Sequence, residues 1–468
     1  MFTVTVRKAQ QTLSLTYSEE VLASRVLEDA GITHPHPCGG RGVCGKCRIL
    51  LNGKEVLACN TRIDSDSTID YTSNSSELQG ITEGFFTLFE KNPLFADGYG
   101  AAIDIGTTTI AGYLYHFPSC ERVRALCIPN PQSAFGADVI SRIEHCGKGA
   151  GDALASAVRG AIEKLCEGYS PVGYVITGNT VMLHLLTKRD PSSMAVAPYL
   201  TDNLFGEWHD NVYLMPCISS YVGADVTAAM LASGMMQDKC SILLDIGTNG
   251  EMALKHGDTL LCCATAAGPC FEGAGICCGT PAVPGAISRV YIEDSEIRFS
   301  CVDGKDPLGI CGTGLVDSIA ALLDMEIIDE TGYMDEEFRF GDSAVVLTPE
   351  DVRQFQLAKS AIRSGLDTLL HHAGIPFSAV EKLYIAGGFG SFLNIDSAVR
   401  VGLIPPELGG KAIAIGNGAG AGASMVLQSR ACLPEAEAIA ARADAVTLTE
   451  NPYFAQRYME NMMFPEKE

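Results

Sequence analysis

Four cysteines near the N-terminus constrain this chain more than any other feature. The stretch HPCGGRGVCGKCRILLNGKEVLAC (residues 36–59) contains Cys38, Cys44, Cys47 and Cys59, separated by five, two and eleven residues. Four closely spaced thiolates are the ligand set of an iron–sulfur cluster or of a structural zinc ion. Zinc ribbons favour two separate CxxC pairs, and this stretch has only one. The spacing therefore favours an iron–sulfur cluster.

The glycines between these cysteines support the same interpretation. They stand at positions 39, 40, 42 and 45, and glycine permits the positive φ angles that let a backbone wrap closely around a bulky cluster. The loop resembles that of 2Fe-2S ferredoxins, and its short final gap is similar to the cluster domains of molybdenum hydroxylases. With strand-like segments at 2–7 and 11–16, it predicts a β-grasp ferredoxin domain over residues 1–71. His34 and His36 precede the loop and are expected on its surface.

Composition limits the compartment and the partners. The N-terminus alternates apolar and polar residues, and no apolar run reaches the roughly 18 residues that cross a membrane. We therefore expect a cytoplasmic chain with no membrane contact, whose 18 cysteines stay thiols, bind metal or do redox chemistry. A net charge of −23 argues against nucleic acid as a partner. The adjacent pairs Cys262–Cys263 and Cys277–Cys278 are expected to pack in the core rather than to bind a second cluster.

Residues 72–98 have the composition of a connector. The segment begins with a polar Ser/Asn-rich stretch, which is typical of a flexible linker. Its second half carries apolar side chains that we expect to dock on a neighbouring domain, namely Phe85, Phe86, Phe89, Leu94 and Phe95.

Two similar turns follow in the remainder of the chain. The first reads Asp104, Gly106, Thr107, Thr108, Thr109, and the second reads Asp245, Gly247, Thr248, Asn249. Each lies between apolar strand-like segments, and the repetition predicts a duplicated fold. One such turn alone would be an ordinary hairpin. Two copies favour a site where amides and hydroxyls bind a phosphate chain and the aspartates bind Mg²⁺ through water.

Two glycine-rich elements complete the predicted nucleotide site. In VEKLYIAGGFG, a buried strand runs into Gly387, Gly388 and Phe389, where backbone without side chains can lie against a flat base. In CGTGLVDSIAALLD (residues 311–324), Gly312 and Thr313 begin a predicted helix. That turn either lines the nucleotide cleft or is only a tight helix start.

Together these motifs resemble the ASKHA superfamily of acetate and sugar kinases, Hsp70 and actin. The resemblance implies an α/β fold of two ribonuclease-H-like subdomains, at 99–238 and 239–430, with a C-terminal tail (431–468) packed on the ATPase. Asp225 lies at or near the start of a predicted helix, where sugar kinases place an activating aspartate. Asp225 would therefore orient or deprotonate the attacking water, with Asp104 as the other catalytic carboxylate. The alternative is that Asp225 only caps the helix.

The combination of both halves is similar to the reductive activators of corrinoid-dependent enzymes. The resemblance rests on PCGGRGVCGKC, LLDIGTNGE and IAGGFGSFLNIDSAVRVGLIP, among other blocks. It implies that the cluster passes one electron to the inactive cobalt(II) of a methyltransferase system's corrinoid protein, giving cobalt(I), while ATP hydrolysis drives the transfer. It also implies an upstream low-potential electron donor, with a homodimer as one expected assembly. Longer members carry an extra domain where this chain has only residues 72–98.

Other functions remain open at this point. An activator of 2-hydroxyacyl-CoA dehydratases would share only the ATPase half, and the N-terminal cysteine loop argues against it. A small-molecule kinase with a ferredoxin sensor would phosphorylate an acceptor that the sequence does not identify. A third alternative is a binding protein in which nucleotide only switches the shape.

Overall fold

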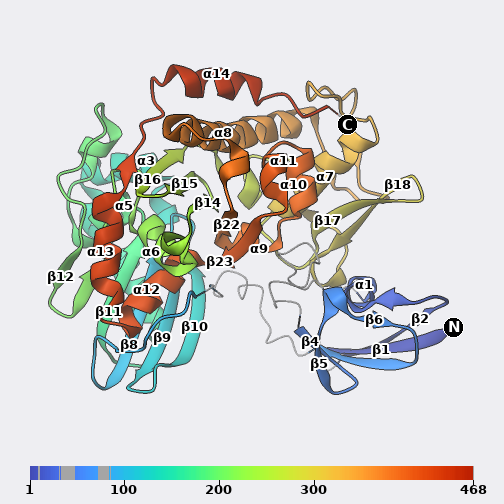
Figure 1. Cartoon of the computed structure of the whole chain (residues 1–468), viewed down its shortest axis with the longest axis horizontal. Helices are drawn as coiled ribbons and strands as arrows, with labels where there is room; N and C mark the ends of the chain where they lie inside the picture. The colour runs from blue at the N-terminus through green and yellow to red at the C-terminus, as the bar shows by residue number, and fades with distance from the viewer. Residues whose placement is uncertain are drawn as a thin grey trace.

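The structure is a computed structural model that describes residues 1–8, 11–30, 32, 48–71, 84, 86–136 and 138–466. Cys38, Cys44 and Cys47, with His34 and His36, lie outside these residues. Two large α/β lobes and a small N-terminal domain make up the molecule (Figure 1). Within the described ranges, no helix combines the length and apolar character needed to cross a bilayer.

The N-terminal domain is a mixed sheet with one helix. Its strands lie in the order β2 (Gln11–Tyr17), β1 (Phe2–Lys8), β7 (Ser67–Tyr71), β4 (Arg48–Leu51) and β5 (Lys54–Leu57). The short strands β3 (Val21–Leu22) and β6 (Arg62–Ile63) pair beside α1 (Ala23–Asp29). Alternate residues of β1, Val4 and Val6, are buried against this helix layer. The β-grasp prediction is confirmed.

The first lobe contains a six-stranded sheet. Its order is β10 (Glu121–Pro129), β9 (Thr109–Phe117), β8 (Gly98–Ile105), β11 (Pro171–Gly178), β13 (Val212–Leu214) and β12 (Glu207–His209). Strands β8, β9 and β10 form an antiparallel meander, and β11 joins parallel to β8. The accompanying helices are α3 (Val139–His145), α4 (Gly151–Leu165) and α5 (Thr180–Thr187).

The second lobe repeats this topology. Its sheet runs β23 (Ala412–Gly416), β22 (Lys382–Ala386), β14 (Cys240–Ile246), β15 (Gly250–His256), β16 (Thr259–Thr265) and β24 (Asp444–Ala445). Again three antiparallel strands come first, and β22 joins parallel to the first of them. Its helices are α7 (Gly312–Asp324), α8 (Pro349–Ala373), α9 (Gly387–Phe392), α10 (Ile395–Arg400) and α11 (Pro406–Gly409). The prediction of two ribonuclease-H-like subdomains is confirmed.

Two helices fill the space between the sheets. Helix α6 (Ala224–Ser233) contacts β11 of the first sheet and β14 of the second. It packs against α12 (Gly418–Gln428), and a Cβ at Gly422 would lie 2.0 Å from the carbonyl oxygen of Ala228, so only glycine permits this approach. Although α12 follows the strands of the second sheet in the sequence, it lies on β8 and β11 of the first.

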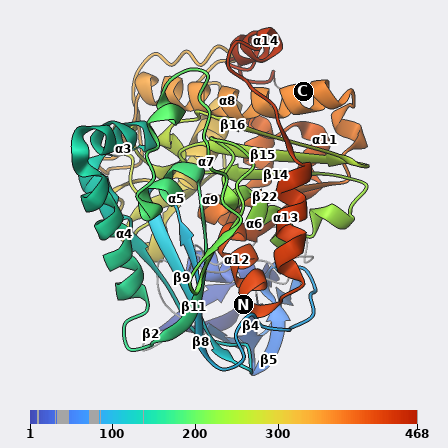
Figure 2. The ribbon, with the colours of Figure 1, turned by 90° about the vertical axis from the view of Figure 1, so that its left-hand side faces the viewer.

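The C-terminal segment packs on both lobes. Helix α13 (Cys432–Arg442) contacts α6, and α14 (Pro452–Glu460) lies across α8 at the top of the molecule (Figures 1 and 2). The second half of the connector also packs on the first lobe through Phe86, Phe89, Leu94 and Phe95, as predicted; Phe85 lies outside the described residues.

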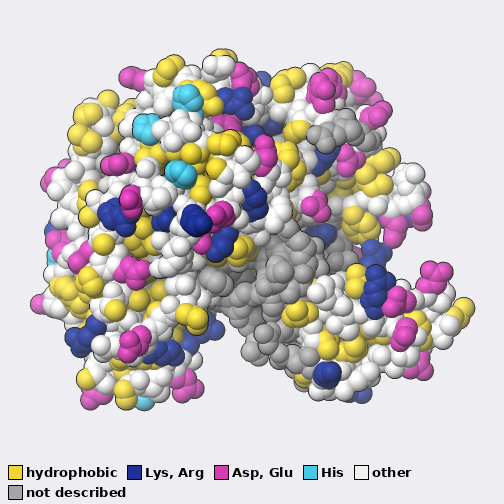
Figure 3. All heavy atoms as spheres, viewed as in Figure 1, with side chains coloured by type: hydrophobic (Ala, Val, Ile, Leu, Met, Phe, Trp, Pro, Cys, Tyr) yellow, Lys and Arg dark blue, Asp and Glu magenta, His cyan; other side chains and the backbone are white. Residues whose placement is uncertain are grey.

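Carboxylates are spread over the face seen in Figure 3 rather than gathered into one patch.

A small sheet extends the second lobe toward the N-terminal domain. It consists of β18 (Glu296–Cys301), β17 (Ala286–Glu293) and β19 (Gly309–Ile310), and α7 packs on β17. The hairpin β20 (Phe338–Arg339) and β21 (Val346–Leu347) follows. Arg25 of α1 contacts this sheet: its Nη2 donates to Glu293 Oε1 at 3.0 Å, and its guanidinium lies 5.5 Å from the centre of the Tyr291 ring.

Candidate functional site

The two repeated turns occupy equivalent places in the two lobes. Asp104 lies near the end of β8 and Asp245 near the end of β14, and each strand turns back into its antiparallel neighbour. The first turn needs glycine, because a Cβ at Gly106 would lie 2.9 Å from the carbonyl oxygen of Thr109. In the second, the Gly247 amide donates to the carbonyl of Asn249 at 2.9 Å. Local turn chemistry thus aligns two carboxylates at matching sheet edges.

Four carboxyl groups converge between the lobes. Burial raises the pKa of Asp104 to about 7, that of Asp245 to about 7 and that of Asp225 to about 6. Burial also raises the pKa of Glu251, on β15, well above its usual value. The negative charge of Asp225 further raises the pKa of each of the other three. Such mutual repulsion is relieved when a cation enters the group.

These carboxylates are not arranged as direct ligands of one ion. Over the described residues, no group of three or more Asp, Glu, His and Cys side chains could hold a metal. Asp104 and Asp245 nevertheless come from opposite lobes, and the charge of Asp104 raises the pKa of Asp245. This chemistry fits Mg²⁺ held through water molecules rather than through a closed protein cage.

Asp225 lies at the start of a helix, as predicted. It is the second residue of α6, after the N-cap Gly223, and its Oδ1 accepts the Val226 amide at 2.8 Å. A Cβ at Gly223 would lie 2.5 Å from the Cα of Asn179, so glycine lets the helix start approach the β11–α5 turn. The carboxylate therefore makes a capping contact within its own helix and still belongs to the acidic cluster.

Two asparagines that sequence reasoning missed support the first turn. Asn417 caps α12 by accepting the Gly420 amide at 2.6 Å, and its Nδ2 donates to Asp104 Oδ2 at 2.9 Å. Asn179 caps α5, and its Nδ2 donates to Thr107 Oγ1 at 3.1 Å. A usable signal was present, because both asparagines follow a glycine that ends a strand and precede a helix.

Glu272 is a third residue that sequence reasoning missed. It ends the 3₁₀ turn Pro269–Glu272, and its Oε2 accepts the Thr248 hydroxyl at 2.7 Å. Both of its oxygens lie 3.4 Å from Thr108 Oγ1. One side chain therefore contacts a threonine from each of the two turns.

The adenosine motif adjoins the second turn. Gly387 begins α9 with a φ of +85°, and a Cβ there would lie 2.9 Å from Asp245 Oδ1. The next residue but one, Phe389, packs on Phe271 with ring centroids 5.1 Å apart. Gly388 lies between them in the same short helix, which begins beside Asp245.

The remaining predicted residues are placed differently. Thr109 is the first residue of β9, and Asn249 hydrogen-bonds to Glu251. Gly312 starts α7 against the 3₁₀ turn, since a Cβ there would lie 1.9 Å from the Phe271 carbonyl oxygen. Thr313 is buried and donates to the Ser288 carbonyl at 3.0 Å. The hydroxyl of Thr313 is therefore engaged by β17.

Of the four cysteines predicted to hold the cluster, Cys59 is the one that lies within the described residues. It is buried in the short turn Ala58–Asn60, which follows β5 and packs in the core of the N-terminal domain. A buried thiol at this place fits the last ligand of a cluster held by the preceding loop.

Among the adjacent pairs, Cys262 and Cys263 lie in the core as predicted, whereas Cys277 is exposed, so the prediction of core packing is wrong there. The cause is that its chain leaves the core in a loop after the 3₁₀ turn.

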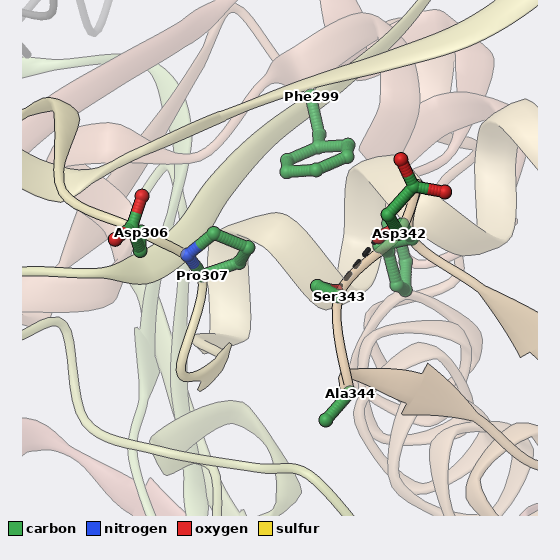
Figure 4. Close-up of a pocket in the computed structure, with 7 residues that line it drawn as sticks. Phe299, Asp306, Pro307, Asp342, Ser343 and Ala344 are labelled. Carbon is green, nitrogen blue, oxygen red and sulfur yellow. Dashed lines mark hydrogen bonds between the residues drawn. The ribbon is translucent and has the colours of Figure 1, made fainter.

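A separate surface cavity of 420 Å³ lies on the small sheet of the second lobe. It is lined by Phe299, Asp306, Pro307, Phe340, Asp342, Ser343 and Ala344 (Figure 4). None of the predicted site residues lines it. The predicted site residues therefore lie at the acidic cluster between the lobes and not at this cavity.

Comparisons with known proteins cover the whole organisation. Three family models match in order: a 2Fe-2S iron-sulfur cluster binding domain at residues 6–71, the RACo middle region at 99–238, and the C-terminal domain of RACo, the ASKHA domain, at 239–468. Corrinoid activation enzyme RamQ of Eubacterium limosum is 30% identical, over 96% of this chain and 97% of that protein.

Two further relatives agree with this result. A Co(II) methylated amine-specific corrinoid protein reductase of Methanosarcina barkeri is 25% identical over 66% of each protein. The solved structure of a reductive activator for corrinoid, iron-sulfur protein superposes with a TM-score of 0.72 at 27% identity, covering 100% of this chain and 99% of that one.

Proposed function

This chain belongs to the RACo family, and from that membership we propose that it reactivates a corrinoid protein by reducing inactive cobalt(II) to cobalt(I) at the expense of ATP. The observation that carries the proposal is the presence, in one chain, of a 2Fe-2S binding domain and two facing turns of the ASKHA type. Neither half alone would couple an electron to a nucleotide.

The N-terminal domain would carry the electron. We propose that Cys38, Cys44, Cys47 and Cys59 hold a 2Fe-2S cluster, which supplies one electron at a time at a potential near −400 mV in plant-type domains. Cys59 would hold its side of the cluster inside the core, away from water. A low-potential donor of electrons and the corrinoid protein would meet the domain in turn.

The two lobes would bind and hydrolyse ATP. Thr107, Thr108 and Thr248 present hydroxyls for the phosphates, and Gly387 with Gly388 presents bare backbone for adenosine. Asp104 and Asp245 would hold Mg²⁺ through water. Asp225, whose pKa is raised to about 6, would accept a proton from the attacking water more readily than an ordinary aspartate.

Energy sets the need for ATP. Moving one electron against 100 mV costs about 2.3 kcal/mol, so hydrolysis can drive a transfer over a few such steps if lobe closure alters the complex with the corrinoid protein. We propose that closure of the two lobes requires Mg²⁺.

We also propose that the chain assembles with a second copy of itself, which size-exclusion chromatography with light scattering would test.

The direct test is a reactivation assay. Anaerobically purified chain is mixed with a corrinoid protein in the cobalt(II) state, a low-potential reductant and MgATP, and cobalt(I) is followed by its absorbance. We expect cobalt(I) only when all components are present, with a non-hydrolysable ATP analogue giving none. Equal rates without ATP, or without the N-terminal domain's iron, would contradict the proposal.

A further inference from the structure

Glu272 joins the two lobes at the centre of the nucleotide site. Its carboxylate accepts the Thr248 hydroxyl at 2.7 Å and lies 3.4 Å from the Thr108 hydroxyl. Thr108 belongs to the turn after β8 and Thr248 to the turn after β14. In the described structure, a protein anion therefore occupies the hydroxyl donors that the repeated turns present to phosphate.

This position is electrostatically unfavourable without those donors. Burial raises the pKa of Glu272, and the two threonine hydrogen bonds lower it again. The charge of Glu272 also raises the pKa of Asp245. A carboxylate held among other carboxylates is easily replaced by a stronger acceptor that brings its own cation, and a Mg²⁺-bound phosphate is such an acceptor.

We propose that Glu272 is a positioning residue that takes the place of a nucleotide phosphate between the two turns and is displaced when ATP binds. The proposal rests on the proposed function, because it assumes that nucleotide binds between these turns. While Glu272 bridges Thr108 and Thr248, it links the lobes; once phosphate takes the hydroxyls, the nucleotide forms that link instead.

The displacement needs only a side-chain rotation. Phe271, the preceding residue, packs between Phe355 and Phe389 with ring centroids 5.7 and 5.1 Å away. Its carbonyl oxygen also lies against Gly312, where no Cβ could fit. Because the backbone of the 3₁₀ turn is fixed by these contacts, the carboxylate leaves by turning about its own side-chain bonds.

The experiment measures nucleotide affinity of the full chain by calorimetry. The variant Glu272→Gln keeps the shape and removes the charge that competes with phosphate. We expect its dissociation constant for a non-hydrolysable ATP analogue with Mg²⁺ to fall about tenfold, equivalent to about 1.4 kcal/mol. Adenosine, which has no phosphate, should bind both proteins equally. Glu407→Gln, an exposed change on α11, is the matched control and should alter neither affinity.

Each outcome decides between roles. Equal or weaker binding of the ATP analogue by Glu272→Gln would overturn the placeholder role, as would tighter binding of adenosine. If Glu272→Gln does not fold, Glu272→Asp replaces it, since a side chain shorter by one methylene cannot reach both threonines and should give the same tightening. A wild-type chain without any nucleotide affinity would overturn the proposed function as well, which is a different result.

Discussion

Replacing Asp225 by asparagine should stabilise the nucleotide-free chain while it abolishes turnover. Burial raises the pKa of this carboxyl from 3.8 to about 6. Each tenfold change in acidity corresponds to about 1.4 kcal/mol, so the shift corresponds to about 3 kcal/mol without screening. The side chain is partly exposed, and solvent screening reduces the expected gain to about 1 kcal/mol.

The sign follows from proton binding. A carboxyl with a raised pKa in the folded state binds its proton more tightly there, so the stability that it contributes is present at low pH and is lost as pH rises from about 4 to about 6. Above that range the charged Asp225 opposes folding, and a neutral amide does not. The gain of Asp225→Asn should therefore be full at pH 8 and absent at pH 4.

Urea unfolding followed by tryptophan fluorescence measures this gain. Trp208 is the only tryptophan, and it lies on β12 of the first lobe, 5.2 Å from the Tyr213 ring. Asp329→Asn is the control with opposite sign, because hydrogen bonds from Thr331 lower the pKa of Asp329 and its loss should destabilise the chain at pH 8.

The rate of ATP hydrolysis by Asp225→Asn is the second measurement. Removing a positioned proton acceptor typically slows a reaction by about 100-fold or more, so Asp225→Asn should bind nucleotide and hydrolyse almost none. A gain over the wild type that is equal at pH 4 and pH 8, or a variant less stable than the wild type at pH 8, would refute the electrostatic reasoning. An unchanged hydrolysis rate would leave Asp225 as a helix cap only.

Three further predictions address the modules. Cys44→Ser should abolish the visible cluster absorbance while nucleotide binding stays, Asp245→Ala should abolish nucleotide binding while the absorbance stays, and both variants should lose reactivation; a folded variant that loses both the absorbance and nucleotide binding would contradict the modular assignment. Arg25→Ala should loosen the docking of the N-terminal domain, measured as faster proteolysis of the connector with unchanged ATP hydrolysis. Gly312→Ala should cost several kcal/mol in the urea assay, because its Cβ would lie 1.9 Å from a carbonyl oxygen; an unchanged midpoint would show that the turn can relax.

The sequence predicted those parts of the site whose physics is local. A strand, a glycine-permitted turn and a second strand fix where Asp104 and Asp245 lie, and the repeat of that unit was enough to predict the duplicated fold. Asn417 could not be found in this way. It is 313 residues from Asp104, and only the packing of α12 on the first sheet brings the two together.

Exposure was the other property that local pattern did not determine. Cys277 and Cys278 have the same residue type and similar neighbours as Cys262 and Cys263. Cys262 and Cys263 lie on β16 and are buried between the sheet and its helices, whereas Cys277 lies in a loop that leads the chain toward β17. Whether each cysteine is buried therefore depends on whether it lies in a strand, and that depends on hydrogen-bonding partners elsewhere in the chain.

The contact between the N-terminal domain and the second lobe is weak enough to be released. Arg25 and Glu293 are 38% and 46% exposed, and an exposed ion pair of this kind contributes less than about 1 kcal/mol. Glu293 is the last residue of β17, and this strand packs closely on α7. A Cβ at Gly314 of α7 would lie 2.0 Å from the Ile287 carbonyl oxygen of β17. Helix α7 begins against the turn that carries Glu272, so one helix connects that turn with the strand that contacts Arg25. A domain held by so weak a contact can leave the second lobe to approach a corrinoid protein.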